Sequence, residues 1–477
     1  MFRYITLCLL IFAAGTTVSA QYLVKGRITD DKIIPLTGAS VTVVENSRLG
    51  STSGLDGSFE ISLPDNSQYT IEVSFIGYKC KREKVTRNAS PVCIVLEPDN
   101  VLLEQIVVTG TRTPKLLKDV PVVTRVINSD VIKNADATDI SELLQSELPG
   151  MEFTYTMNQQ TTLNMSGFGG NSVLFLVDGE RLAGETLDNV DYSRLTLDNV
   201  KKIEIVKGAA SSLYGSNAVG GVVNIISQPP EEPWNVKING RYGAFNEYLY
   251  GCSAGFKTGK VSSMTSVRFN GIKDISLADY ARNENIGDYK TIYGNRVINV
   301  KERLVYEPLQ NLKFTGRAGY FFRERNTSTN NKERYRSISS GLKGNYIISG
   351  EDDLEIAYSF DQYDKSDFLF SGKKDIRDYS NIQNSARIVY NHRFSGKHIL
   401  TAGGDYMNDY IMSYQFEGKG YYSQHSLDGF VQFDWNPMKK LNITAGARVD
   451  WFSAASLCNI SPKLGIMYKM KDCSLRA

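Results

Sequence analysis

Apolar and polar residues alternate through most of the chain beyond residue 228. Residues 354–360 place Leu, Ile, Tyr and Phe at every second position, and residues 441–451 repeat the arrangement with other apolar residues. A period of two predicts β-strands with one apolar and one polar face, each about ten residues long. We therefore expect residues 229–477 to be built of strands.

The connections between these strands fall into two length classes. A soluble sheet has no reason to sort its loops by side, whereas a transmembrane barrel has short periplasmic turns and long extracellular loops. The pattern thus predicts an antiparallel transmembrane β-barrel, with Trp435 and Trp451 suited to its interfacial girdles. Short turns are expected at residues 257–260, 307–311, 350–353, 395–397 and 436–440, and long polar loops at residues 273–293, 324–336, 363–383 and 409–424.

The N-terminal residues have the layout of a secretory signal. Arg3 precedes a mostly apolar run over residues 4–14, and residues 18–20 are small, as a cleavage site requires. The apolar run is shorter than the ~20 residues of a membrane-spanning helix. We expect residues 1–20 to be a signal peptide.

Two shorter domains are expected between the signal and the barrel, joined by a linker over residues 99–115. Residues 21–98 contain strand-like runs separated by Gly and Asp turns, which predicts a small β-sandwich. Residues 116–228 mix helical and strand patterns, which predicts an α+β domain. Its helices are expected to start near residues 129 and 139, and its strands to lie at residues 172–177, 200–207 and 221–226.

The net charge and the histidines bear on two kinds of binding, that of nucleic acid and that of haem or a metal ion. A net charge of +2 gives no reason to expect nucleic acid as a partner. His392 and His398 flank a short turn, and His425 follows a long loop, so the three histidines form no ligand cluster for haem. We expect no metal site, no cofactor and no catalytic residue, and hence not an enzyme.

The six cysteines leave one pairing open. Cys8 leaves with the signal, while Cys80 and Cys93 share one small domain and can pair in an oxidising periplasm. Cys458 and Cys473 lie at opposite ends of an expected strand, roughly 30 Å apart, which is too far for a disulfide. We expect these two and Cys252 to be free thiols.

Residues 26–30 (GRITD), 36–41 (LTGASV) and 56–59 (DGSF) resemble the carboxypeptidase regulatory-like domain, and the likeness spans residues 21–98. That segment contains no histidine, so a zinc peptidase site with imidazole ligands cannot form there. A binding or spacer role is expected instead.

Residues 200–227, VKKIEIVKGAASSLYGSNAVGGVVNIIS, resemble the end of the plug domain of TonB-dependent receptors nearly position for position. Residues 175–181 (FLVDGER) and 148–151 (LPGM) fit the same family. A phosphate-binding loop is the rival interpretation, but no Gly-Lys-Ser/Thr follows the glycines. The resemblance marks as plug-motif residues Asp178, Gly179, Glu204, Lys207, Gly208, Tyr214, Gly215, Gly220, Gly221 and Asn224.

One position departs from that family. Related plugs commonly carry an arginine before the Gly-Phe of the central strand, where this chain has Ser166 before Gly167 and Phe168. The departure puts one plug–barrel ion pair in doubt.

Residues 104–110, directly before this plug, resemble a TonB box. An extended, β-branched segment beside a linker can add a strand to a partner sheet; an ordinary edge strand is the alternative. The box residues are Glu104, Gln105, Ile106, Val107, Val108, Thr109 and Gly110. The resemblance implies TonB with its inner-membrane energising complex as partner, and the outer membrane of a Gram-negative bacterium, with its lipid, as location.

The same resemblance implies import of a ligand bound by the extracellular loops and the plug apex. Gly208 after Lys207 favours the class that imports scarce metal chelates, namely siderophores, haem or cobalamin. The alternatives are a SusC-like importer of glycans or peptides with a surface lipoprotein, or an outer-membrane protein that binds without transport. Candidate ligand contacts are Tyr155, Asn158, Gln159, Asn189 and Tyr192, which offer hydrogen bonds and stacking.

The barrel segment is short for such a receptor. Plugged transporters have about 22 strands, and residues 229–477 would supply only about eleven residues to each, which a strand alone consumes. We therefore expect about half of a 22-stranded barrel, as in a C-terminally truncated chain.

Overall fold

The computed structural model describes residues 22–30, 33–64, 68–75, 78, 80–86, 91–96, 106–155, 161–184, 189–208, 210–230, 232–277, 291–328, 331–395, 397–418, 420–438, 440–454, 456–470 and 474–476. The chain divides into two compact units, Met1–Gln105 and Ile106–Ala477. The expected signal peptide, residues 1–20, lies outside the described residues.

The first unit contains two small sheets whose buried side chains form one apolar cluster. Alternate residues of its first strand are buried, among them Val24 and Ile28, because one face of that strand covers the cluster. Cys80 and Cys93 are both free thiols, so the pairing left open by the sequence does not occur. The sheets have the orders β4(Ser58–Leu63)-β1(Tyr22–Asp30)-β7(Val92–Leu96) and β3(Asn46–Thr52)-β2(Ser40–Val43)-β5(Tyr69–Ser74)-β6(Lys81–Val85).

The plug segment of the second unit is α+β, as expected. Its helices are α3 (Ser129–Ala135), α4 (Ile140–Glu147) and the short α5 (Ser211–Tyr214). The side chain of Asp139 caps α4 by accepting from the Glu142 amide at 2.9 Å, which explains why this helix begins there. Its sheets have the orders β10(Thr124–Asn128)-β16(Val200–Lys207)-β17(Gly221–Ser227)-β14(Val173–Val177)-β15(Glu180–Arg181) and β11(Met151–Tyr155)-β12(Thr161–Met165)-β13(Phe168–Gly169).

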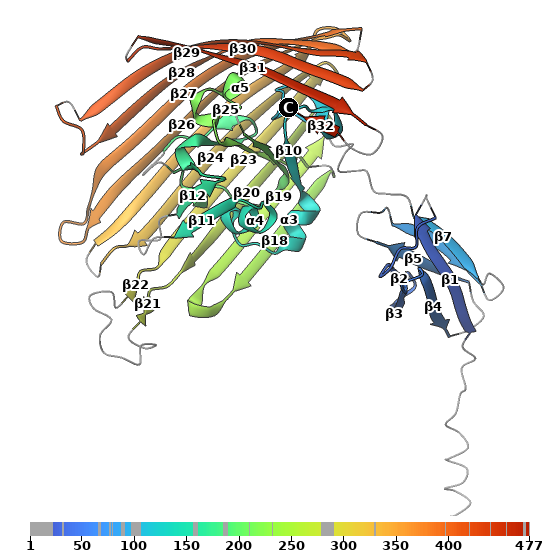
Figure 1. Cartoon of the computed structure of the whole chain (residues 1–477). Helices are drawn as coiled ribbons and strands as arrows, with labels where there is room; N and C mark the ends of the chain where they lie inside the picture. Colours follow the sequence, from blue (N-terminus) through green and yellow to red (C-terminus); the bar gives the residue numbers. More distant parts are fainter. Residues whose placement is uncertain are drawn as a thin grey trace, which may run out of the picture. The chain divides into compact units, whose positions relative to one another are not determined.

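The remaining large strands pair in chain order as one antiparallel sheet, which has thirteen strands among the described residues. Figure 1 shows this sheet as a curved wall, a partial barrel, with the plug segment against its concave side. The strands are β18(Trp234–Tyr242), β19(Tyr248–Thr258), β20(Val261–Ile272), β23(Asn295–Leu309), β24(Leu312–Asn326), β25(Asn331–Ile347), β26(Asp352–Leu369), β27(Lys374–Phe394), β28(His398–Ser413), β29(Tyr421–Met438), β30(Leu441–Phe452), β31(Leu457–Lys469) and β32(Ser474–Arg476).

The short turns are confirmed, but three of the predicted long loops are largely wrong. Residues 409–413 and 421–424 of one predicted loop belong to β28 and β29. Residues 324–336 and 363–383 are largely strand, and β27 alone is 21 residues long. Polar composition misled the prediction, because charged side chains here pair across strands instead of forming loops. Arg334 bonds Asp375 at 3.0 Å and Lys365 bonds Asp378 at 2.8 Å, so β-pairing continues into polar sequence.

Other expected features can also be placed. Cys252 and Cys458 are free and exposed, whereas Cys8 and Cys473 lie outside the described residues. In the part of the chain that the structure describes, no helix is long and apolar enough to cross a membrane.

The outer face of the wall yields a test of its membrane exposure. Ile356, the fifth residue of β26, lies in the outward-facing apolar run Leu354, Ile356, Tyr358 and Phe360 and is 54% exposed. Ile356→Arg should lower the free energy of unfolding in phospholipid vesicles by ~2–4 kcal/mol, because the guanidinium would sit in hydrocarbon. Phe370→Arg, in the turn after β26, is the matched control and should change it little; equal losses from the two variants would contradict a lipid-facing strand.

Candidate functional site

The predicted box begins the second unit and is folded back onto it. Its first two described residues form β8 (Ile106–Val107), which pairs antiparallel with β9 (Lys115–Leu116). The side chain of Thr109, three residues later, is completely buried. Glu104 and Gln105 lie outside the described residues.

One carboxylate holds this segment. Glu204, on β16, accepts hydrogen bonds at one oxygen, Oε2, from the amides of Val108 (3.0 Å) and Thr109 (2.8 Å) and from the Thr109 hydroxyl (2.6 Å). Asn224 donates to the same hydroxyl at 3.0 Å, and Lys202 lies 2.7 Å from the other Glu204 oxygen. The main-chain donors of Val108 and Thr109 are therefore occupied inside the plug. This clamp has to open before these amides can pair with a partner strand.

The residues that follow the box are anchored on the barrel wall. Both terminal nitrogens of Arg112 lie 3.3 Å from Asp405 on β28, and Lys115 pairs with Asp434 on β29 at 2.8 Å. The Arg112 guanidinium stacks between the rings of Tyr214 (4.7 Å) and Phe430 (4.6 Å). The chain thus passes from a plug clamp to a wall anchor within a few residues.

Tyr214 is neutral at this anchor. Its burial raises the pKa of the phenol to about 12, against the smaller opposing effect of Arg112. The ring therefore presents an uncharged face to the guanidinium throughout the physiological pH range.

A second contact joins the plug to the wall at the turn after β14. Three successive carbonyls each accept a hydrogen bond from a different barrel strand: Arg317 binds Val177 O (2.5 Å), Lys343 binds Asp178 O (2.8 Å), and Arg387 binds Gly179 O (3.1 Å). From the plug side, Asn224 accepts from the Gly179 amide at 3.1 Å, and the Asp178 carboxylate accepts from the Ser227 amide and hydroxyl.

Two of the motif glycines, Gly220 and Gly221, lie where a side chain has no room. A Cβ on Gly221 would come 2.5 Å from the Val206 carbonyl oxygen, and one on Gly220 would come 2.7 Å from Phe168. Gly208 and Gly215 have φ values of +87° and +85°, a conformation that favours glycine. The remaining motif lysine, Lys207, donates to the Pro149 carbonyl at 3.3 Å.

Ser166 cannot form the plug–barrel ion pair that an arginine would make at its position, but two other ion pairs join the plug to the barrel. Arg194 pairs with Asp361 of β26 at 2.7 Å, and both side chains are buried. Asp191 pairs with Arg323 of β24 at 3.1 Å. The pattern of the sequence does not predict the pairing of Arg112, Arg194 or the cations of the wall. Charged residues at alternate, inward positions of the barrel strands are the signal that could have identified the wall cations.

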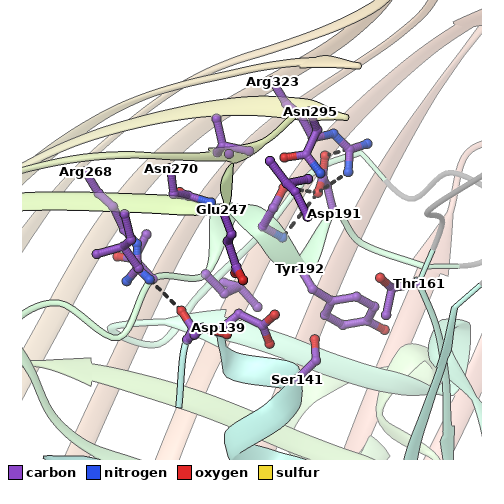
Figure 2. A pocket seen from close by; sticks show the side chains of 18 of the residues that line it. Asp139, Ser141, Thr161, Asp191, Tyr192, Glu247, Arg268, Asn270, Asn295 and Arg323 are labelled. Carbon is purple, nitrogen blue, oxygen red and sulfur yellow. Dashed lines mark hydrogen bonds and ion pairs between the residues drawn. The ribbon is translucent and has the colours of Figure 1, made fainter. Parts of the chain in front are cut away.

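A cavity of about 370 Å³ lies between the plug and the strand ends opposite the short turns. Arg268 and Arg323 reach it from β20 and β24, as Figure 2 shows, and both are paired with plug carboxylates, Asp198 and Asp191. Its other polar lining consists of acids, amides and hydroxyls: Asp139, Glu247, Asn270, Asn295, Ser141 and Thr161.

Three of the candidate ligand contacts line this cavity. Tyr155 is 59% exposed and open to a ligand. Asn189 and Tyr192 are buried, and the Asn189 carbonyl accepts from the Leu163 amide (3.0 Å) and the Tyr192 hydroxyl (3.1 Å), so they also hold the plug apex together. Asn158 and Gln159 lie outside the described residues. Ligand contact by these residues stays a prediction.

The histidines are placed separately. His392 pairs with Asp352 at 2.7 Å and His398 accepts from the Asn436 amide at 3.0 Å, both near the short-turn end. His425 lies on the exposed face of β29 within 2.8 Å of the Tyr406 hydroxyl. Among the described residues, no group of three or more His, Cys, Asp or Glu side chains could hold a metal ion.

Comparison with known families assigns each part of the chain. Residues 24–108 match the CarboxypepD_reg-like domain, residues 116–222 the TonB-dependent Receptor Plug Domain, and residues 253–477 the model named TonB dependent receptor-like, beta-barrel. The chain belongs to the TonB-dependent receptors. It is therefore an outer-membrane protein of a Gram-negative bacterium, and the short-turn end of its barrel is the periplasmic end.

Characterised relatives are transporters and receptors. The chain is 31% identical over 172 residues to a vitamin B12 transporter of Photobacterium profundum, covering 35% of this chain and 28% of the relative. It is 32% identical over 140 residues to the iron-regulated outer membrane virulence protein of Vibrio cholerae, covering 28% and 21% of the two chains. The matches thus span less than a third of these relatives.

Solved structures share the fold. The ferric enterobactin receptor of Pseudomonas aeruginosa superposes with a TM-score of 0.62 at 16% identity, over 74% of this chain and 60% of the receptor. The pyoverdine-bound receptor FpvA of P. aeruginosa also gives 0.62, at 14% identity, over 84% and 65% of the two chains.

The clamp generates a direct test. Glu204→Ala should speed amide hydrogen exchange of residues 106–111 by roughly 10- to 100-fold, because losing hydrogen bonds to a charged group costs ~1.5–3 kcal/mol. Exchange measured by mass spectrometry would report it. Glu152→Ala, on the exposed side of β11, serves as the matched control. Unchanged exchange in the Glu204 variant would show that the carboxylate does not retain the box.

Proposed function

We propose that this protein imports a scarce metal chelate, a siderophore, haem or cobalamin, across the outer membrane with energy supplied by TonB. The observation that carries the proposal is the box itself: a β-prone segment clamped by Glu204 and followed at once by the Arg112 anchor. The outer membrane lacks a nucleotide supply, so work must reach the plug by pulling from a partner energised elsewhere.

The cavity at the plug apex supports ligand capture. Its volume of about 370 Å³ lies in the range of small-molecule sites, ~300–1,000 Å³. Tyr155 offers an exposed aromatic face, and the amides and hydroxyls around it offer hydrogen bonds. The characterised relatives, a vitamin B12 transporter and an iron-regulated protein, favour a chelate as cargo.

The clamp suggests how capture and pulling are linked. Asn189 and Tyr192 connect the cavity to the apolar core of the plug, where Tyr192 packs edge-on against Phe153 and Phe175 at 5.2 Å. Glu204 and Asn224, on β16 and β17 of the same plug, hold Thr109. A ligand that shifts this core alters the support of the clamp, and a freed box can then pair with TonB.

Deleting residues 104–110 tests energised import. In cells that express the protein, the deletion should abolish uptake of radiolabelled chelate while surface binding of the same chelate stays unchanged, because the cavity is left intact. Persistent uptake would contradict a TonB-driven mechanism.

The second candidate function is SusC-like import of glycans or peptides with a surface lipoprotein. Growth of a knockout on cyanocobalamin, haem and ferric enterobactin, each supplied as the limiting source, discriminates the two. The chelate proposal expects a growth defect on at least one of them. Normal growth on all three, with a defect on a glycan or peptide source, favours the alternative.

A further inference from the structure

Two arginines face each other on the inner wall of the barrel. Arg303 of β23 and Arg317 of β24 are directly paired in the antiparallel register, and both side chains point toward the plug. The Arg317 side chain lies across Gly341 of β25, where a Cβ would meet its Nε at 2.6 Å. Like charges placed directly opposite on neighbouring strands destabilise a sheet unless something neutralises them.

Neither arginine has a carboxylate partner among the described residues. The Nε and Nη1 atoms of Arg303 are buried there without any hydrogen-bond partner, and Arg317 gives Nη1 to the neutral Val177 carbonyl. Other inward arginines differ, since Arg268 pairs with Asp198 and Arg323 with Asp191. Buried guanidinium nitrogens are costly to leave unpaired.

Both arginines line two adjoining cavities between plug and wall. The larger has a volume of about 360 Å³ and the smaller about 110 Å³, so a small group has room beside the pair. Lys343, which donates to the Asp178 carbonyl and lies 3.7 Å from Glu180, also lines the larger cavity, together with Arg112, Lys313 and Arg387.

The carboxylates of the larger cavity are already engaged elsewhere. Glu180 and Glu355 both contact Arg387, Asp353 pairs with Arg393 at 2.5 Å, and Asp178 is bonded to Ser227. A net positive charge therefore remains around the paired arginines.

We propose that Arg303 and Arg317 form a binding site for one oxyanion on the inner barrel wall, beside the plug turn at Asp178 and Gly179. The planar forks of two guanidinium groups match the oxygens of a carboxylate or phosphate, and the anion supplies the partners that the buried nitrogens lack. The anion is either a free ion or an acidic group of a ligand in transit; the second source rests on the proposed import function.

The first experiment measures anion binding on the purified full chain. Thermal unfolding is followed in 10 mM inorganic phosphate and in chloride at equal ionic strength. Phosphate should raise the midpoint of the unmodified protein by about 3 °C. In R303Q/R317Q this rise should disappear. The phosphate-induced rise is the readout, and not the midpoint in chloride, because the double variant relieves the repulsion but also loses the hydrogen bond from Arg317 to the Val177 carbonyl.

Matched variants separate this site from general salt effects. Arg334→Gln, near the start of β25 and paired with Glu324 and Asp375, should keep the full phosphate response. If the double variant does not fold, Arg303→Gln alone carries the test, since Arg303 has the unpartnered nitrogens. No phosphate response in the unmodified protein, or an equal response in the arginine variants, would overturn the proposal.

A second experiment distinguishes the two sources of the anion. Initial uptake rates of anionic ferric enterobactin and neutral cyanocobalamin are compared in cells carrying either the unmodified protein or R303Q/R317Q. A loss of at least tenfold for the anionic probe alone, with surface binding unchanged, assigns the site to a ligand in transit. A phosphate response without any uptake change assigns it to a free oxyanion, and absence of uptake in the unmodified protein contradicts the import function but not the site.

Discussion

Cationic side chains on the inner barrel wall hold the plug, because they donate hydrogen bonds to plug carbonyl groups. Three successive carbonyls, at the end of β14 and in the turn after it, accept hydrogen bonds from Arg317, Lys343 and Arg387 of the wall. Because buried carbonyls and buried cations are both costly without partners, each side of the interface depends on the other. The plug is therefore fixed in rotation and depth by hydrogen bonds from three different strands.

Buried hydrogen bonds and ion pairs also hold the segment that a partner would pull. Glu204 holds Val108 and Thr109 within the plug, while Arg112 and Lys115 pair with Asp405 and Asp434 of the barrel wall. A force on the box thus meets two resistances in order, first hydrogen bonds to one carboxylate and then buried ion pairs with stacked rings. Only two residues separate Thr109 from Arg112, so a displacement of the box acts directly on the contact between this segment and the wall.

Several elements follow from local sequence because their causes are local. The cap at Asp139 and the strand over residues 200–207 need only neighbouring residues. The hairpin at residues 363–383 was mispredicted as a loop because its polar residues satisfy each other across strands, which single-chain patterning does not reveal. The polarity of Asn189 predicts it as a ligand contact, whereas the hydrogen bond that it accepts from the Tyr192 hydroxyl depends on the packing of the plug apex.

The sequence by itself determined the class of this protein: alternating strands with sorted turns, a plug motif and an adjacent box. Only the tertiary structure decided how these parts are connected. Glu204 meets Thr109 across 95 positions and Arg317 meets Val177 across 140, and Arg303 faces Arg317 because of strand register alone. Such contacts depend on where a side chain lands once strands pair and the plug docks. Residue type and local spacing predict the strands, helices and turns, whereas the tertiary structure determines which partner each buried charge meets.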